Sequence, residues 1–393
     1  MISFLQARQI IKEQAQSFGV EIVDIEFALG RVIAEDVFAT RDFPPFNRSL
    51  MDGIAINIVD FQNGIRQFKC VETILAGGTA THVLKQGECY KIMTGAAVPI
   101  IANAIIRIED LTVNDDVFTL LVGSVNKDQN IAQQGQDVKK DILAIKKGTL
   151  IRTATVGFLA SLGLAKVSVE KLPKVKLITT GNEVLDLSQE ALPTHIYNSN
   201  KYVIQALLNQ DQISLSGNLH VLDDVEALKL NIHQNLLETD ILIISGGVSA
   251  GEVDYIPSIL EDLGLIKLFH KVAIKPGKPI WCGVFENKTM VFALPGNPYS
   301  CLVTFKLFIE FYINACLNKS NLEMIPLTLN FNRLKPSNLD EFFPVDFTNG
   351  VLNKIAINGS GDVRLGFEAN ALALQAADRK EIVQGEPVPC LLL

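Results

Sequence analysis

Asp240-Ile241-Leu242-Ile243-Ile244-Ser245-Gly246-Gly247 is the stretch of this 393-residue chain that decides its fold class. Its four large aliphatic residues follow one another with no polar residue between them, which is typical of a β-strand buried on both faces. Strands of this kind belong to parallel sheets that helices cover on both sides. The serine and the two glycines that follow end the strand in a turn.

The same pattern repeats on both sides of this stretch. Between residues 173 and 320, apolar strands alternate with segments of helical periodicity, which predicts a three-layer α/β domain built on a parallel sheet. The expected strands are residues 175–180, 213–221, 240–244, 265–274 and 290–294. The expected helices are residues 200–210, 223–237, 255–263 and 298–317.

The rest of the chain divides into three further regions. Apolar residues from Ile10 to Phe18, Ala15 included, are spaced for one face of a helix that ends at Gly19, and residues 153–164 predict a second apolar helix. Residues 42–139 are rich in glycine and β-branched residues, which predicts a mostly β module. Residues 321–393 predict a small C-terminal β-barrel or sheet.

Composition excludes several classes of protein. Hydrophobic residues make up 48% of the chain and charged residues 20%, which is too apolar for a disordered protein. The formal net charge of −8 argues against a protein that coats nucleic acid, because backbone-driven binding needs a basic surface. The longest uncharged run, residues 289–305, is too short and too rich in Pro and Gly for a membrane span, and no secretory signal is visible. We expect a cytoplasmic protein that binds neither nucleic acid nor membrane.

In an open parallel sheet, ligands bind beyond the carboxyl ends of the strands. Four segments follow expected strands and should therefore share one rim: Thr179–Glu183, Ser245–Asp254, Lys271–Pro279 and Leu294–Ser300. Their glycines let backbone N–H groups approach an anion, and their lysines supply charge for phosphate or oxyanion groups. Glu183 and Asp254 could hold Mg²⁺, which favours carboxylates combined with substrate phosphates.

Each segment alone has a simpler interpretation. Ser245-Gly246-Gly247 could be an ordinary turn, Pro276–Pro279 a rigid solvated loop, and Asp254 a helix N-cap. The glycine pattern is neither a P-loop nor a dinucleotide fingerprint. The coincidence of four such segments on one rim favours an anion-binding site.

Taken together, these motifs resemble the molybdopterin molybdenumtransferase family (MoeA and the related domain of gephyrin). The resemblance spans essentially the whole chain, and each motif alone is weak while the ordered set is highly specific. That set consists of Ser49-x-Met51-Asp52-Gly53, Met93-Thr94-Gly95-Ala96, Gly181-Asn182-Glu183, Ser245-Gly246-Gly247-Val248-Ser249-x-Gly251, Lys275-Pro276-Gly277-Lys278-Pro279, Leu294-Pro295-Gly296-Asn297-Pro298 and Gly359-Ser360-Gly361.

The resemblance implies an elongated homodimer with four domains in each subunit. These would be a split N-terminal domain (1–41 and 140–172), an inserted β-rich domain (42–139), an α/β molybdopterin-binding domain (173–320) and a C-terminal β domain (321–393). It implies a Mg²⁺-dependent transferase of molybdenum cofactor biosynthesis, which inserts molybdate into adenylylated molybdopterin and releases AMP. The site would lie between the α/β domain of one subunit and the inserted domain of the other.

The family's functional residues carry over by motif in two groups. Catalytic roles are implied for Asp52, Thr94, Asp137, Glu183, Asp223 and Asp254, of which Glu183, Asp223 and Asp254 would bind the metal. Substrate binding is implied for Ser245, Gly246, Gly247, Ser249, Gly251, Lys271, Lys275, Lys278, Pro295, Gly296, Asn297, Ser300 and Ser360.

Two segments depart from the family pattern. Arginines are missing just before Asp137, and Asn338–Phe342 lacks the expected Gly-Arg pair. This loss of positive charge either weakens binding of molybdate or moves that role to Arg333 or Arg364.

Two other functions stay open at this point: a divergent hydrolase of another nucleotide–pterin, and a non-catalytic dimeric scaffold that binds the pterin. The expected partners are small anionic substrates, a second copy of the chain, molybdopterin adenylyltransferase and molybdoenzyme acceptors. Release of AMP that depends on molybdate would separate the transferase from both alternatives.

Overall fold

The computed structural model describes residues 1–248, 255–286, 288–319, 324–364 and 368–393. Ser249, Gly251 and Asp254 of the predicted site therefore lie outside the described residues. The chain divides into two compact units, one of residues 1–21, 30–32 and 169–393 and the other of residues 22–29 and 33–168. The predicted fold class, a multidomain α/β protein with a C-terminal β-barrel, is confirmed. The four predicted domain boundaries stay a prediction.

The first unit is built on a six-stranded sheet in the order β16-β13-β17-β21-β20-β18. Its strands are β13 (Val175–Thr180), β16 (Leu215–Val221), β17 (Ile241–Ser245), β18 (Ile266–His270), β20 (Trp281–Val284) and β21 (Met290–Leu294). β13 pairs in parallel with both β16 and β17, and β17 pairs in parallel with β21, as predicted.

One edge of this sheet departs from the parallel prediction. The unpredicted strand β20 runs antiparallel to both β21 and β18. Only residues 285–289 join β20 to β21, and a connection this short permits an antiparallel hairpin but no parallel crossover. The predicted strand 265–274 is also divided, because Lys271 adopts a positive φ of 69° between β18 and β19 (Ile274–Lys275).

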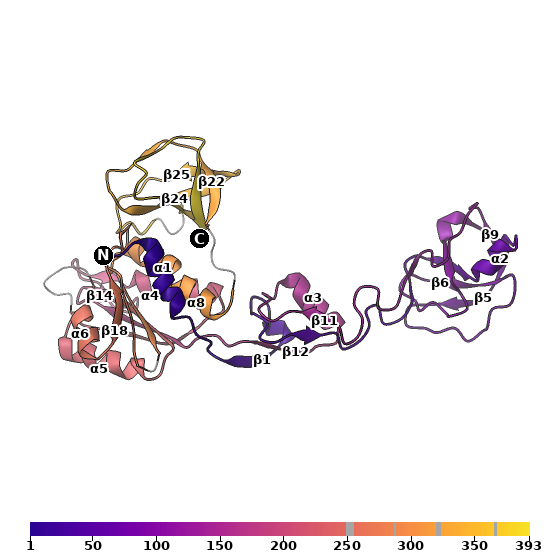
Figure 1. Cartoon of the computed structure of the whole chain (residues 1–393), viewed down its shortest axis with the longest axis horizontal. Coiled ribbons are helices and arrows are strands. Elements are labelled where there is room, and N and C mark those ends of the chain that lie inside the picture. The colour runs from indigo at the N-terminus through magenta and orange to yellow at the C-terminus, as the bar shows by residue number, and fades with distance from the viewer. Residues whose placement is uncertain (249–254, 287, 320–323, 365–367) are drawn as a thin grey trace. The chain divides into compact units, whose positions relative to one another are not determined.

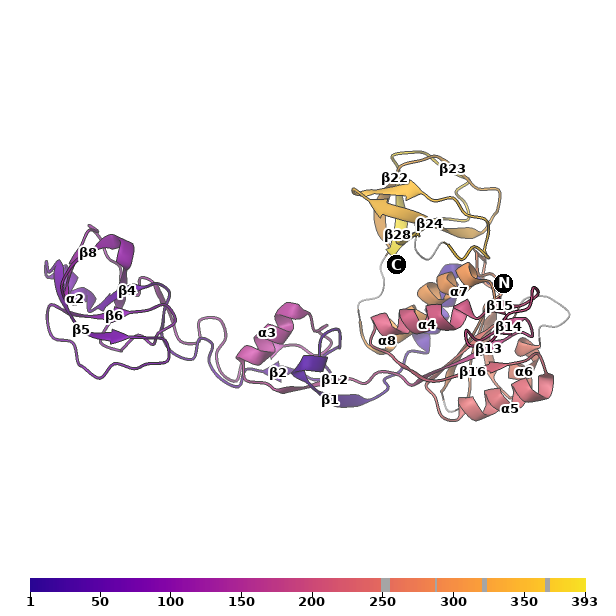
Figure 2. The same cartoon turned by 180° about the vertical axis from the view of Figure 1, so that it is seen from behind.

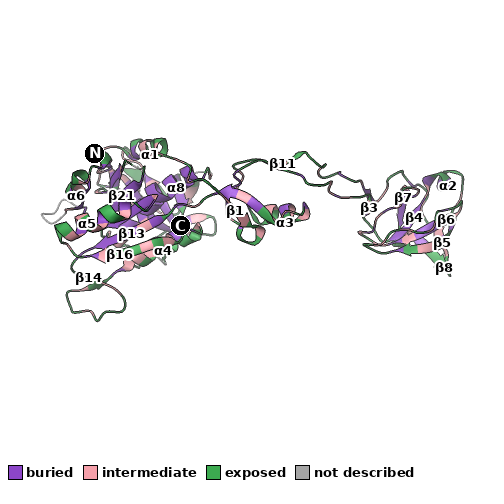
Figure 3. Cartoon of the chain, turned by 90° about the horizontal axis from the view of Figure 1, so that it is seen from below, coloured by how far each residue is buried: buried purple, intermediate pink, exposed green. Residues whose placement is uncertain are grey.

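Helices cover both faces of the sheet (Figure 1), as the alternation of elements predicted. One face carries α1 (Phe4–Glu13), α4 (Ser199–Gln210), α7 (Pro298–Thr304) and α8 (Glu310–Cys316), and the other carries α5 (Val225–Leu236) and α6 (Ile256–Asp262). A π-helical segment, Phe305–Ile309, joins α7 to α8 within the predicted long helix. Figure 3 shows that β13 and β21 are buried between these layers.

Helix α1 ends earlier than predicted. It stops at Glu13, so Ala15 and Phe18, which the sequence pattern assigned to its apolar face, lie beyond it. The residues it buries are Phe4, Ala7 and Ile11. No buried apolar residue follows Ile11 within the next turn, and packing of an apolar face is what stabilises most helices in proteins.

The C-terminal part of the first unit is a closed β-barrel (Figure 2), as predicted. The strands are neighbours in the order β24-β25-β22-β28-β26, and β26 pairs back onto β24. They are β22 (Ile325–Leu329), β24 (Asp340–Thr348), β25 (Val351–Lys354), β26 (Ala371–Gln375) and β28 (Pro387–Leu392), with β23 (Arg333–Leu334) paired to β27 (Glu381–Ile382) beside them. β19 pairs in parallel with β24 and so ties the barrel to the loops at the sheet edge.

The second unit has a mostly β core of its own. Its six-stranded sheet has the order β7-β4-β6-β5-β9-β8 and buries one apolar cluster on each face. The strands are β4 (Gly53–Ile56), β5 (Gln67–Ile74), β6 (Glu88–Ile92), β7 (Ala104–Arg107), β8 (Leu111–Asn114) and β9 (Val117–Leu120). The same unit contains β2 (Val37–Phe38), β3 (Arg48–Ser49), α2 (Ile58–Gln62), β10 (Ile131–Ala132), β11 (Leu143–Ile145) and α3 (Thr153–Ser161). β1 (Val20–Asp24) pairs with β12 (Lys166–Glu170) where the two units join along the chain. Across the residues described above, no helix is long and apolar enough to cross a membrane.

Candidate ligand site

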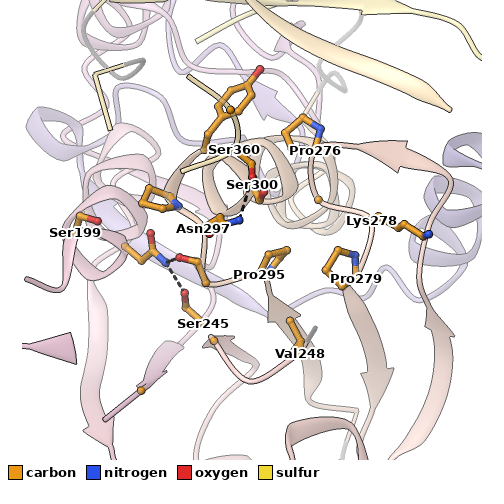
Figure 4. Close-up of a pocket in the computed structure, with 18 of the residues that line it drawn as sticks. Ser199, Ser245, Val248, Pro276, Lys278, Pro279, Pro295, Asn297, Ser300 and Ser360 are labelled. Carbon is orange, nitrogen blue, oxygen red and sulfur yellow. Dashed lines mark hydrogen bonds between the residues drawn. The ribbon is translucent and has the colours of Figure 1, made fainter. Parts of the chain in front are cut away.

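A cavity of about 950 Å³ opens at the carboxyl ends of the parallel strands (Figure 4). Small-molecule sites typically span roughly 300–1,000 Å³, so this one can hold a large ligand. Residues at the ends of β13, β17 and β21 line the cavity together with barrel residues on β23 and β24. The four segments that the sequence placed on one rim therefore meet around a single cavity.

The structure gathers most of the predicted α/β site residues in this lining. They are Glu183, Asp223, Ser245, Gly246, Gly247, Lys275, Lys278, Pro295, Gly296, Asn297, Ser300 and Ser360. Lys271 is not part of the lining, and its backbone N–H donates to the Ile280 carbonyl oxygen at 3.0 Å. The roles of all these residues in binding and catalysis stay predictions.

The loop after β13 carries the acidic side of the cavity. The Asp223 N–H donates to Asn182 Oδ1 at 3.0 Å, and the Asn182 N–H donates to Asp223 Oδ2 at 3.3 Å. This reciprocal pair fastens the end of β16 to the end of β13.

Gly181 has a φ of +131°, and a Cβ there would lie 3.0 Å from Glu183 Oε2. Glycine therefore leaves room for the Glu183 carboxylate beside the loop.

A hydrogen-bond network behind this loop holds it in place. His220 on β16 has Nε2 3.1 Å from the Gly181 carbonyl oxygen and Nδ1 3.1 Å from Thr179 Oγ1. Because a carbonyl oxygen accepts, Nε2 carries the proton and Nδ1 accepts from the Thr179 hydroxyl. Asn198 Nδ2 donates to the same hydroxyl oxygen at 2.8 Å, so α4 is tied to β13 as well.

Two glycine turns lie side by side at the ends of β17 and β21. The Gly246 N–H donates to the Leu294 carbonyl oxygen at 3.1 Å, and a Cβ on Gly296 would lie 3.8 Å from Gly246 Cα. Gly246 has a φ of +108°, and a Cβ there would lie 2.6 Å from Thr180 Oγ1. Glycine is therefore required at this position for both conformational and steric reasons.

Asn200, in the first turn of α4, connects these two turns. Its Nδ2 donates to Ser245 Oγ at 2.9 Å and to the Gly296 carbonyl oxygen at 2.8 Å. The carbonyl oxygen fixes the orientation of the amide, because an amide oxygen in the same place could not donate to it. The side chain is buried, with 9% of the residue exposed.

Glu341 pairs with two of the basic residues in the cavity lining. The pairing of β19 with β24 sets Lys275 opposite Glu341, and Lys275 Nζ lies 3.3 Å from Glu341 Oε1. The Arg333 guanidinium lies 2.6 Å from Glu341 Oε2. Burial disfavours the ionised form of Glu341, but hydrogen bonds from Ser337 and Arg333 and the nearby positive charges outweigh it and lower the pKa of Glu341.

Lys278 differs from Lys275 in its surroundings. Its side chain is exposed and forms no ion pair with any residue that the structure describes.

Of the two arginines that could replace the missing family charge, Arg333 lines the cavity and Arg364 does not. Arg364 instead pairs with Asp362 at 3.0 Å.

The loop before α7 and the first turn of that helix hold the barrel region against the strand-end loops that line the cavity. Asn297 Nδ2 donates to Ser360 Oγ at 3.0 Å, and the Tyr299 N–H donates to the Ser360 carbonyl oxygen at 3.2 Å. The Tyr299 hydroxyl donates to the Phe342 carbonyl oxygen at 2.9 Å. Figure 4 shows Asn297, Ser300 and Ser360 together at this boundary.

The remaining predicted catalytic residues belong to the second unit. Asp52 Oδ1 accepts hydrogen bonds from the Thr94 N–H at 2.6 Å and from the Thr94 hydroxyl at 2.8 Å, and both side chains are exposed. The backbone bond and then the hydroxyl bond lower the pKa of Asp52. Asp137 is exposed on a different loop, where its N–H donates to the Phe43 carbonyl oxygen at 3.0 Å.

Two of the three predicted magnesium ligands line the cavity. Glu183 and Asp223 line the same cavity from two adjacent loops, and the third predicted ligand, Asp254, lies outside the described residues. The structure contains no group of three or more His, Cys, Asp or Glu side chains that could hold a metal ion, within the residues it describes. Mg²⁺ commonly takes one or two carboxylates and completes its shell with water and substrate phosphates.

Sequence reasoning missed the side of the cavity formed by residues 196–200. These residues run from β15 (Ile196–Tyr197), which pairs with β14 (Val184–Leu185), into the start of α4. An apolar pair before an asparagine cap is ordinary at the start of a helix, so the pattern carried no sign of a site. Glu341 was also missed, although it lies in the segment that departs from the family pattern.

Comparison with known proteins agrees with this architecture. Residues 2–163 match the family described as "MoeA N-terminal region (domain I and II)", and residues 176–315 match the "Probable molybdopterin binding domain". The molybdopterin molybdenumtransferase of Staphylococcus epidermidis is 30% identical over 395 residues, covering 98% of this chain and 94% of that protein. The enzyme of the same name from Synechocystis is 30% identical over 355 residues, covering 89% of this chain and 87% of its own length. The crystal structure of the molybdopterin biosynthesis MoeA protein from Pyrococcus horikoshii matches with a TM-score of 0.85 at 28% identity, covering 100% of both chains.

The fold and the site define a multidomain protein with a molybdopterin-binding α/β region, whose ligand cavity lies between strand-end loops and a β-barrel. This chain belongs to the molybdopterin molybdenumtransferase family. The resemblance drawn from its motifs is thereby confirmed.

Proposed function

We propose that this protein inserts molybdenum into adenylylated molybdopterin and releases AMP, as a step of molybdenum cofactor biosynthesis. The observation that carries the proposal is the cavity at the strand ends, which gathers residues of five family motifs in one place. Relatives named molybdopterin molybdenumtransferase, 30% identical along 98% of the chain, support it. The cavity volume of about 950 Å³ suits a substrate that joins a pterin to a nucleotide.

The described lining holds balanced formal charge. Its basic residues are Lys275, Lys278 and Arg333, and its acidic residues are Glu183, Asp223 and Glu341. Binding of phosphate and molybdate therefore depends on where charges and hydrogen-bond donors lie, more than on net charge. In this proposal Lys278, the N–H groups of the glycine turns and the serine hydroxyls donate to the anionic oxygens.

We assign Mg²⁺ to Glu183 and Asp223. When bound, the ion would neutralise part of the charge of the substrate's phosphates and polarise a phosphoryl oxygen. The reciprocal hydrogen bonds between Asn182 and Asp223 hold the two acidic loops together and so prepare this side of the cavity. Asp254 stays a predicted third ligand.

We further propose that the protein is a homodimer, in which Asp52 and Thr94 of one subunit complete the site of the other. The support is that these two residues form an exposed, hydrogen-bonded pair in a unit with its own core. Molybdopterin adenylyltransferase, as the source of the substrate, and molybdoenzymes, as acceptors of the product, are the predicted protein partners.

The test incubates the purified protein with adenylylated molybdopterin, Mg²⁺ and molybdate, and measures AMP together with active cofactor. A transferase releases AMP only when molybdate is present. AMP release without molybdate would identify a hydrolase, and pterin binding without AMP release would identify a scaffold. Omitting Mg²⁺ and adding a chelator should slow AMP release, and unchanged rates would reject the magnesium assignment.

A further inference from the structure

Asn200 occupies a position that none of the family motifs includes. It lines the cavity, and its one amide group donates to both Ser245 and Gly296. These two acceptors lie on different segments: Ser245 is the last residue of β17, directly before its glycine turn, and Gly296 belongs to the turn after β21. A single buried side chain therefore joins two of the loops that are proposed to bind the anionic part of the substrate.

The two turns need such a connection because of their composition. Gly246, Gly247 and Gly296 have no side chains that could anchor them, and glycine gives the backbone unusual freedom. Backbone N–H groups bind an anion well only when they are held in place before it arrives. The bonds from Asn200 are short, at 2.9 and 2.8 Å; the bond to Ser245 is buried and the bond to Gly296 is partly buried.

The same amide also determines the direction of hydrogen bonding at the Ser245 hydroxyl. Asn200 Nδ2 can only donate, so Ser245 Oγ accepts from it and keeps its own proton to donate elsewhere. Among the residues that the structure describes, the other protein atom within reach is Cys301 Sγ, at 4.0 Å, and sulfur is a weak acceptor. The hydroxyl proton is therefore available to an anionic oxygen in the cavity.

We propose that Asn200 is a positioning residue for the anionic part of the substrate, which holds the two glycine turns at a fixed spacing and presents Ser245 as a hydrogen-bond donor. The inference rests on the proposed function, since it takes phosphate or molybdate oxygens as the ligand atoms. It adds a residue and a mechanism that the motif-based assignment lacks.

The test measures binding of AMP and of molybdate by calorimetry for wild type, Asn200→Ala, Ser245→Ala and the double variant. Asn200→Ala should weaken binding of one or both anions about tenfold, because the Ser245 hydroxyl, no longer held in place, gives up one charge-assisted hydrogen bond to the anion. Adding Ser245→Ala to Asn200→Ala should cost little more, because both changes disturb the same unit. Asn200→Asp keeps the size of the side chain but lacks the amide donors, so it should weaken binding too, and it replaces Asn200→Ala if that variant fails to fold.

Asn314→Ala is the matched control. Asn314 is also a buried asparagine of the first unit, on α8, but it does not line the cavity. Its loss should lower the melting temperature without changing the affinity for either anion. Wild-type affinity in Asn200→Ala, or full additivity of the Asn200 and Ser245 effects, would overturn the inference. Failure of the proposed function is distinguishable, because wild-type protein itself would then release no AMP or would release AMP equally well without molybdate.

Discussion

At the scale of single residues, Lys275 and Lys278 show how two similar motif positions differ in their surroundings. Lys275 shares Glu341 with Arg333, whereas Lys278 has no ion-pair partner among the residues described. A lysine that is already paired gives up part of an existing interaction when it binds a ligand. We therefore expect the two lysines to contribute unequally to anion binding.

The first prediction follows from this difference. Lys278→Gln should weaken binding of molybdate or AMP about tenfold, because it removes a charge-assisted hydrogen bond. Lys275→Gln should weaken it less than about threefold, within the range of an exposed ion pair. Calorimetric titration of both variants checks this, and equal losses of affinity would show that the Glu341 pair does not restrain Lys275.

The second prediction concerns Asp52 and pH. Its pKa is lowered in the folded protein, first by the Thr94 N–H and then by the Thr94 hydroxyl. An acid with a lowered folded pKa adds stability above its unfolded pKa, near 3.9, and that stability is lost as the pH falls through the folded pKa. The advantage in melting temperature of wild type over Asp52→Asn should therefore shrink between about pH 5 and about pH 3.

Scanning calorimetry of the full chain at several pH values measures this difference. Thr94→Val serves as a companion variant, because it removes the hydroxyl donor and leaves the backbone donor in place. It should reduce the pH dependence in part. A difference between wild type and Asp52→Asn that stays constant across this range would contradict the assignment.

At the scale of elements, the turn between β19 and β20 depends on Gly277. This residue has a φ of +96°, and a Cβ there would lie 2.4 Å from Thr304 Cγ2 on α7. Gly264, after α6, has a similar φ of +80° but open space around its Cα. The two positions therefore separate the conformational need for glycine from the steric need.

The third prediction uses this pair. Gly264→Ala should cost about 1–2 kcal/mol, the penalty of the left-handed conformation. Gly277→Ala should cost about 1–3 kcal/mol more, because it adds overpacking against α7. Thermal melts give both values. Gly277→Ala combined with Thr304→Ser, which removes Cγ2 and keeps the hydroxyl, should recover part of the extra loss, and no recovery would show that the clash is not the cause.

The central elements were predictable because their signals are local. β17 and β21 carry uninterrupted apolar runs, β13 is mostly apolar with Lys176 as its one charged residue, and α4 and α5 each bury residues spaced four apart on one face. β20 was missed because it has only four residues and contains Gly283, which weakens a strand signal. Closure of the barrel through β24 and β26 depends on contacts between distant segments, so the local pattern left open whether these strands form a barrel or an open sheet.

The candidate site was predictable to a similar extent. Segments that directly follow parallel strands had to meet at one edge of the sheet, and they do. Glu341 and Asn200 enter the cavity from the barrel and from the start of a helix, and only the folded chain brings them there. Their importance comes from what they contact, and a sequence without its fold does not contain that information.

At the scale of the whole molecule, the predicted catalytic and substrate-binding residues are divided between two units. Glu183, Asp223 and Lys278 belong to the first unit, whereas Asp52 and Thr94 belong to the second, and each unit buries apolar clusters of its own. A reaction that needs both sets must bring them together within one chain or between two. Family resemblance favours the second arrangement, and a mixing experiment decides between them.

The last prediction is that two impaired variants complement each other in one dimer. Asp52→Asn changes the second unit and Lys278→Gln changes the first. If each site combines the first unit of one subunit with the second unit of its partner, a dimer of these two variants contains one site with both residues intact and one site with neither. Co-expression with two different affinity tags isolates this heterodimer, which should release AMP at about half the wild-type rate, because one of two symmetric sites is restored. If each site forms within a single chain, every site in the heterodimer lacks one residue, and its rate stays at the level of the parent variants. Light scattering on the same samples must show twice the subunit mass of 43.1 kDa, and a fully active monomer would exclude any arrangement in which subunits share a site.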